Sequence, residues 1–360
     1  MARAKQRWLP AFLIPLALLA AVLVGSVQAG ASPSLPPKSA EEIIAMAVKT
    51  DVRALSGKVS QVANLGLPQL PGPGPSAEPG AASLLGLLAG THEARVYVDA
   101  PSKVRLQILD ALAERDVVVN GADAWFYNSA DNSAVHTTLP ARSGSGGTDG
   151  PADTQGPTSQ AVSPESLAKR MLTAIDDSTE ATPGEPATVA GRSAYTLLLK
   201  PRSAGTLVDS ASINVDAETG LPLAITVRAK GQSEPAFSLS YTELQLGAPE
   251  ASLFTFVPPA GAKVTEQSLP SSNSKPAGSP PPSKHAIKTS GIGWDSVVSL
   301  PARALPTAVF ANPQISQTLQ PVKGGRALTT ALVNILVLDD GRVFAGMVPL
   351  DRLESAAAAD

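Results

Sequence analysis

The sequence predicts an α+β protein dominated by antiparallel strands, with a small, mainly β domain at its C-terminal end. Strand-like apolar runs recur with turn signals at intervals of roughly ten residues, a spacing typical of antiparallel β structure. In residues 103–109, KVRLQIL, apolar and polar side chains alternate as in a strand with one buried face. Only two segments, 39–50 and 163–176, have a good helical pattern, and with the short apolar segment 83–89 they should cover only part of the sheet.

The N-terminus has the layout of a secretory signal peptide. A basic start precedes an apolar run over residues 8–25, and Val27 and Ala29 are the small residues of a cleavage site. We therefore expect residues 1–29 to be removed and the protein to be extracytoplasmic, either secreted or in the cell envelope. An uncleaved membrane anchor is the alternative, because the run is nearly long enough to span a bilayer. Pro10 and Pro15 weaken that alternative.

The two helices carry clear start signals. Ser39 is followed three residues later by Glu42, which is the pattern of a capping box. Ser163 can cap the second helix, because Pro164 then takes the first helical position, where a missing N–H does no harm.

Strands are predicted in two groups. The first begins with residues 54–63 and includes a hairpin marked by Asn120-Gly121, and the second is divided by the turn DAETGLP. A Ser/Pro-rich linker over residues 265–285 follows, and residues 286–355 form the small β-rich domain, with a hairpin at Asp340-Gly341. This tail could instead add strands to the main sheet.

Signatures of covalent chemistry are nearly absent. The chain has no cysteine and three histidines, none of them at metalloprotease spacing, and no phosphate-binding or nucleophile-elbow motif. Charged residues make up 16% of the chain and the net charge is −3, which argues against nucleic acid as a partner. We expect a protein that is not an enzyme, with no catalytic residues, no cofactor and no metal site.

Residues 39–264 resemble the LolA-type lipoprotein carriers and the lipoprotein-carrier-like domain of the RseB/MucB sigma-factor regulators. The resemblance is carried by the order of several segments: a first helix leading to LSGKVSQV, then DAPSKVRLQIL, VVVNGADAWFYNSADNSA, VAGRSAYTLLLKP, VDAETGLPLAITV and LFTFVPPAGAKV. The long loops 66–82 and 141–162 depart from it. It implies an unclosed β-barrel, a curved antiparallel sheet covered by short helices, in which residues 38–264 form a lipid- or lipoprotein-binding domain.

In such a fold the concave apolar interior accommodates acyl chains. We expect apolar strand faces to line that cavity, and the candidates are Val104, Leu106, Ile108, Trp125, Tyr127, Leu197, Leu199, Leu223, Ile225, Phe237 and Leu239. On a strand, Trp125 and Tyr127 share one face and Phe126 takes the other. Which of the two faces points inward stays open, as does the alternative that all three are ordinary core.

Two functions follow as hypotheses. The first is an exported protein that holds lipid or lipoprotein acyl chains in an apolar cavity for transfer, without covalent chemistry. The alternative is an extracytoplasmic sensor that regulates a membrane anti-sigma factor, a membrane-protein partner, through an RseB-like domain.

Overall fold

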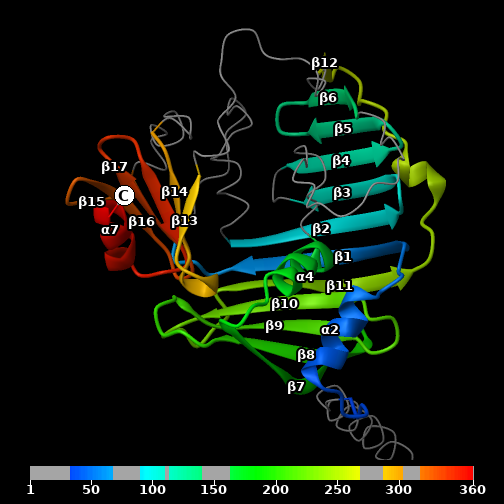
Figure 1. Cartoon of the computed structure of the whole chain (residues 1–360). Helices are drawn as coiled ribbons and strands as arrows, with labels where there is room; N and C mark the ends of the chain where they lie inside the picture. The colour runs from blue at the N-terminus through cyan, green and yellow to red at the C-terminus, as the bar shows by residue number, and fades with distance from the viewer. Residues whose placement is uncertain are drawn as a thin grey trace, which may run out of the picture.

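The computed structural model describes six stretches of the chain, which form two β-sheets flanked by short helices (Figure 1). The described residues are 33–67, 90–109, 113–139, 163–267, 287–302 and 317–359. Outside them lie the expected signal peptide 1–29, most of the 66–82 loop, the 141–162 loop and most of the 265–285 linker.

The larger sheet, called the main sheet here, has twelve strands in the order β12-β6-β5-β4-β3-β2-β1-β11-β10-β9-β8-β7. Neighbouring strands are antiparallel, except for the parallel pair β12 and β6. β12 and β7 lie at opposite ends, so the sheet is unclosed, which confirms the predicted fold class (Figure 1). The strands are β1 Ala54–Ala63, β2 Gly90–Asp99, β3 Lys103–Leu109, β4 Glu114–Asn120, β5 Asp123–Asn128, β6 Ser133–Thr138, β7 Thr179–Val189, β8 Arg192–Pro201, β9 Val208–Asp216, β10 Pro222–Ala229, β11 Phe237–Leu246 and β12 Lys263–Glu266.

Two helices pack on one face of this sheet, which we call the inner face. α2 (Ala40–Val48) and α4 (Pro164–Thr173) both begin with a capping box, formed by Ser39 with Glu42 and by Ser163 with Ser166. The predicted start signals are therefore confirmed. α2 packs on β7–β9 and α4 on β10 and β11, so both helices lie over the same half of the sheet.

The core of that half is formed between the helices and the strands beneath them. Ile43 of α2 and Leu172 of α4 pack against apolar side chains of β8, β9 and β10 that are almost completely removed from solvent. Burial of this kind is the main favourable contribution to folding, at about 25 cal/mol per Å² of apolar surface.

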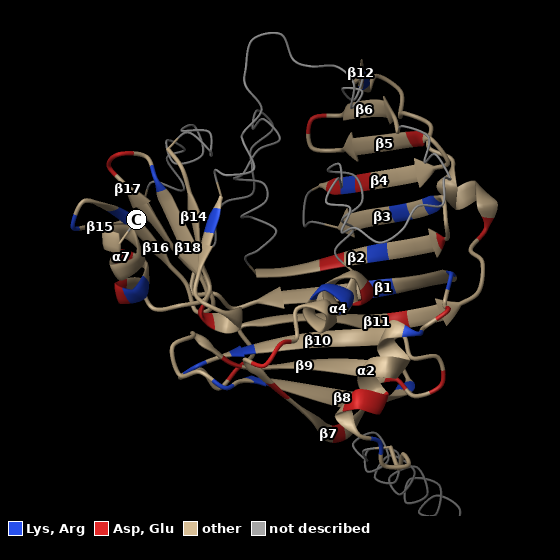
Figure 2. Cartoon of the chain, viewed as in Figure 1, with Lys and Arg blue, Asp and Glu red and all other residues tan. Residues whose placement is uncertain are grey.

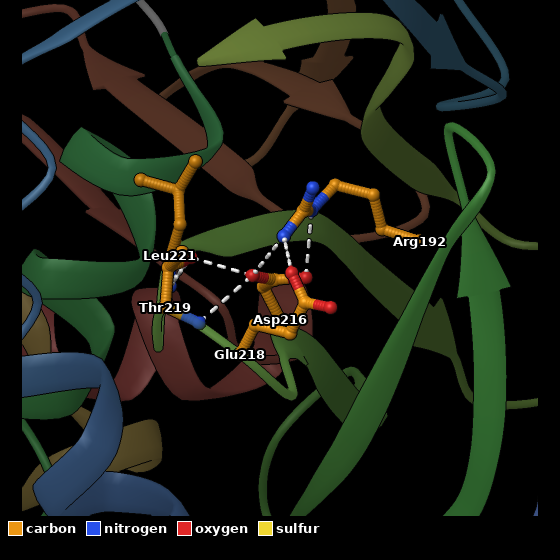
Figure 3. Close-up of polar contacts among 5 residues, drawn as sticks. All are labelled: Arg192, Asp216, Glu218, Thr219 and Leu221. Atoms are coloured by element: carbon orange, nitrogen blue, oxygen red, sulfur yellow. Dashed lines mark hydrogen bonds and ion pairs between the residues drawn. The ribbon is translucent and has the colours of Figure 1, made fainter. Parts of the chain in front are cut away.

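A polar network fixes the β9–β10 turn beneath α2 (Figure 3). Arg192 donates to both carboxylate oxygens of the buried Asp216, at 2.8 and 2.9 Å, and to Glu218 at 2.7 Å. The backbone N–H of Thr219 also donates to Asp216, at 2.9 Å. Desolvation by burial raises the pKa of the Asp216 carboxyl, but these hydrogen bonds stabilise its charged form by more. The net effect is a lowered pKa of Asp216.

The C-terminal part forms a separate sheet of six short strands. Their order is β13-β14-β18-β17-β16-β15, and α7 (Leu350–Ala359) packs on β17 and β18. The predicted hairpin at Asp340-Gly341 joins β17 to β18. The strands are β13 Lys288–Ser290, β14 Val297–Leu300, β15 Gln320–Val322, β16 Gly325–Thr329, β17 Asn334–Leu338 and β18 Val343–Gly346.

The two sheets meet through a shared apolar cluster, which we call the joint. Leu332 of the smaller sheet packs with the fully buried residues Val208 and Ala236 of the main sheet. Two backbone hydrogen bonds cross the joint, from the N–H of Leu207 to the carbonyl of Met347 at 2.8 Å and from Ala331 to Leu65 at 2.9 Å. The smaller sheet is thus not an addition to the main sheet, but it packs against it.

Candidate ligand-binding face

The strand register assigns the predicted residues to the two faces of the main sheet. Leu106 lies opposite Val96 of β2, and Val96 lies opposite Gly57 of β1. Following these pairs to β11 places Val104, Leu106 and Ile108 on the inner face, together with Leu239.

Two apolar rows cross the inner face from β2 to β6. The first is Val96, Leu106, Val117, Phe126 and Val135, and the second is Val98, Val104, Val119 and Ala124. We call these residues the apolar rows. Within them Val96 and Ala124 are buried, whereas the others are only half-buried.

The half-burial of the rows follows from where the helices lie. α2 and α4 pack on β7–β11, and neither packs extensively on β3–β6 within the described part of the chain. Beyond the rows the inner face becomes polar, because Ile108 is followed across the strands by Arg115, Asn128 and Ser133. The apolar surface therefore has a polar border along one side.

The other half of the inner face is filled. Five predicted residues from this half are at most 2% exposed and belong to the packed core: Leu197, Leu199, Leu223, Ile225 and Leu239. Phe237 is half-buried and packs beside the joint. In the structure these side chains contact helices and neighbouring strands, so among the described residues the half-buried apolar surface of the inner face lies on β2–β6.

Trp125 and Tyr127 lie on the opposite, outer face. Trp125 pairs with Val118 of β4, and Val118 pairs with Arg105, which points away from Leu106. The segment after β11 covers both rings, because Phe256 lies 5.3 Å from Trp125 and 5.7 Å from Tyr127 between ring centroids. The two sets of predicted residues thus do not share one face.

Phe126, Val117 and Val135 take the inner positions that the sequence prediction did not assign. A signal for them exists in the hairpin. The turn at Asn120-Gly121 pairs Asn120 with Asp123, and counting back along both strands pairs Val117 with Phe126. If β3 also pairs with β4, the alternation of side chains along the strands places Phe126 on the same face as Leu106.

Charged residues are frequent along β2–β4, as Figure 2 shows, and the strand register places Arg105 and Asp116 on the outer face. Asp116, 3% exposed, accepts from Arg105 at 2.6 Å, and Arg105 also donates to the carbonyl of Leu253 at 3.0 Å. Desolvation raises the pKa of Asp116, although its contacts with Arg105 act in the opposite direction. The hydrogen bond from Arg105 to Leu253 ties the covering segment, with η2 (Ala251–Phe254), to the outer face.

A second buried polar pair stands where the filled half meets the apolar rows. The hydroxyl of Tyr241, on β11, donates to Oε1 of Glu165 in the first turn of α4, at 2.6 Å. Burial raises the pKa of both groups. The ring of Tyr241 lies over Gly57, where a Cβ would come within 2.8 Å of it, so a glycine in this strand makes room for the ring.

Other site chemistry is limited in the part of the chain that the structure describes. No group of three or more His, Asp or Glu residues there could hold a metal ion. Within the same residues, no helix has the length and apolar character needed to cross a membrane.

Comparisons with known proteins return likenesses of structure only. No protein-family model matches the chain, and no curated protein matches it. Solved structures similar to it include MucB in complex with MucA(peri), at 16% identity and a TM-score of 0.44, covering 88% of this chain and 97% of that chain. The MucA/MucB complex of Pseudomonas aeruginosa has 16% identity and a TM-score of 0.43, covering 88% and 96%. A LolA superfamily protein from Nitrosomonas europaea has 8% identity and a TM-score of 0.25, covering 61% and 99%.

Both groups named by the sequence resemblance are represented among these structures. At such identities and TM-scores the likeness assigns no ligand or partner to this chain. Its fold is defined by the strand order of the two sheets.

Proposed function

We propose that the protein is an exported binding protein that holds lipid or lipoprotein acyl chains against the apolar rows of the main sheet. The observation that carries the proposal is the half-burial of Leu106, Val117, Phe126 and Val135 on a sheet face whose other half is closed by helices. An apolar surface of this kind, bordered by polar residues, is typical of a ligand-binding face.

The size of the rows suits an alkyl chain. From β2 to β6 they cross four spaces between strands, which is about 19 Å at about 4.8 Å each. Each methylene that such a surface removes from water contributes about 0.8 kcal/mol. A single chain lying across the strands would therefore gain enough to bind without any covalent bond.

The experiment that tests the proposal starts with organic extraction of natively purified protein and mass spectrometry of the extract. Bound lipid is expected. Its absence, together with no binding of a fluorescent fatty acid to the purified protein, would contradict the proposal.

Substitutions can test whether the two halves of the inner face differ in function. Val117→Asn should weaken binding of the fluorescent fatty acid at least tenfold with a modest loss of stability, because the side chain is already partly exposed. Leu197→Asn is the matched control in the filled core, where a buried amide should destabilise the fold by several kcal/mol. Equal effects of both changes on stability would mean that the rows are ordinary core.

Export is part of this proposal. Residues 1–29 should be absent from the protein in its native envelope, with cleavage near Ala29, because the basic start, apolar run and small residues have the layout of a signal peptide. Intact-mass measurement decides this, and a retained segment in a membrane fraction would mean an anchored protein.

A second function, regulation of a membrane anti-sigma factor, is favoured by one feature of the smaller sheet. Within the described part of the smaller sheet, β13 is an edge strand with all three residues exposed, and Ile287 and Ile292 beside it are 62% and 76% exposed. An exposed edge of this kind can pair with an extended segment of a partner. Protection of the β13 amides from hydrogen exchange by the extracytoplasmic segment of such a factor would support this function over lipid carriage.

A further inference from the structure

His136, on the outer face of β6, lies between carboxylates from two other strands. Its Nδ1 is 2.8 Å from Oε2 of Glu266 on β12, and its Nε2 is 3.2 Å from Oδ1 of Asp123 on β5. A neutral imidazole has a single N–H and can donate to one carboxylate only, whereas the protonated ring donates to both. The arrangement therefore suits the charged form of His136.

The ring also stacks on an aromatic side chain. The centroids of His136 and Trp125 are 4.3 Å apart with an interplanar angle of 22°, and Phe256 lies on Trp125 in turn. A cation over an indole face is attracted by its electrons, which again favours the protonated ring. Asp123 from β5 and Glu266 from β12 are the charged groups that face His136 among the described residues.

The contacts of His136 with Glu266 and Asp123 raise its pKa. Partial burial lowers its pKa, but the hydrogen bonds and charges of Glu266 and Asp123 raise it by more, so that the net shift is upward from 6.5. A histidine with a raised pKa stabilises the folded arrangement fully below its ordinary value. That stabilisation is lost as the pH rises through the folded-state pKa.

The strand that His136 holds has few other attachments. β12 is the outermost strand of the described main sheet, all four of its residues are exposed, and its pairing is with β6 alone. Backbone hydrogen bonds flank this pairing, from Lys263 to Asn132 and from Gln267 to His136. β12 is also the last element of the main sheet before the chain continues toward the smaller sheet.

We propose that His136 is a pH-sensitive latch that holds edge strand β12 on the main sheet and releases it when the imidazole loses its proton. Release exposes the backbone edge of β6. The latch is independent of the acyl-chain proposal, because it lies on the outer face.

Nuclear magnetic resonance and hydrogen exchange test the latch on the mature chain. The resonances of the three histidines are followed against pH, and His136→Asn identifies the relevant one. His136 should titrate above 6.5, and Glu266→Gln should lower its midpoint toward that value. Amides of residues 263–267, corrected for intrinsic rates, should exchange severalfold faster once the pH passes the midpoint, while those of β11 stay protected.

Two control variants complete the test. In His136→Asn the same amides should exchange rapidly at every pH, and His92→Asn, on the inner face of β2, should leave both the midpoint and the exchange unchanged. A midpoint at or below 6.5 would overturn the proposal. So would protection of β12 that is the same above and below the midpoint, or that survives in His136→Asn.

Discussion

At the scale of single residues, ionisable groups of the main sheet pair with partners on other strands or helices. Arg105 and Asp116 pair on the outer face, and Tyr241 and Glu165 pair between β11 and α4. A buried charge is tolerated only when it is paired and hydrogen-bonded, so removal of one partner costs more than the pair itself contributes.

The Arg105–Asp116 pair gives the first prediction. Arg105→Met should lower the free energy of unfolding by about 3 kcal/mol, because it leaves the carboxylate of Asp116 buried without its cation. Urea denaturation measures the loss. Lys58→Met is the control, since the Lys58–Glu243 pair is solvent-exposed and should contribute about 0–1 kcal/mol. Equal losses in the two variants would contradict the prediction.

Glu165 gives a prediction for pH dependence. Its pKa is raised from 4.5 by burial, so the folded protein holds this proton more tightly than the unfolded chain does. Stability should therefore fall as the pH rises from 4.5 through the folded-state pKa. Glu165→Gln keeps a partner for Tyr241 and should flatten this part of the stability profile, measured by urea midpoints across the range. An unchanged slope would show that another group is responsible.

At the scale of elements, the β9–β10 turn determines how closely α2 packs on the main sheet. The network around Asp216 fixes the β9–β10 turn, and Gly220 in that turn has φ +73° and lies against the end of α2. A Cβ at Gly220 would come within 2.4 Å of the carbonyl oxygen of Met46. The turn and the helix can approach this closely only because the residue is glycine.

Gly220→Ala should therefore destabilise the protein by more than the strain of a left-handed residue alone. We expect a loss above about 2 kcal/mol, whereas Gly121→Ala should cost about 1 kcal/mol. Gly121 is a close control, because its φ is +65° and nothing lies within 4 Å of an added Cβ. Urea denaturation of both variants distinguishes the clash from the strain, and equal losses would rule out the contact with α2.

At the scale of the whole molecule, the joint decides whether the two sheets act as one folding unit. Leu332 packs against residues of the main sheet that are completely buried, such as Val208 and Ala236. Separation of the sheets would expose this apolar surface to water, at a cost proportional to its area.

The joint leads to the last prediction. Leu332→Asp should lower the melting temperature of the main sheet by several degrees, because about 1 kcal/mol corresponds to about 2–4 °C in a domain of this size. Val333→Asp, at an adjacent position that is 37% exposed, is the control. Circular dichroism measures both. A chain ending at Gln267, which keeps β12 whole, should show a lower melting temperature as well, and an unchanged value would mean that the smaller sheet is an independent module.

The sequence by itself determined the local features of this protein. Strands β1 and β4, the capping box at Ser39, the cap at Ser163, and the turns at Gly121 and Gly341 depend on side-chain period, caps and backbone freedom, which act over a few residues. The tertiary structure alone decided that β11 returns to β1, that Leu197 and Ile225 are buried beneath helices, and that Trp125 faces outward. The alternation of side chains along a strand predicts only which residues share a face of the sheet. Which face is covered depends on packing between segments far apart in the chain, and no local pattern records that packing.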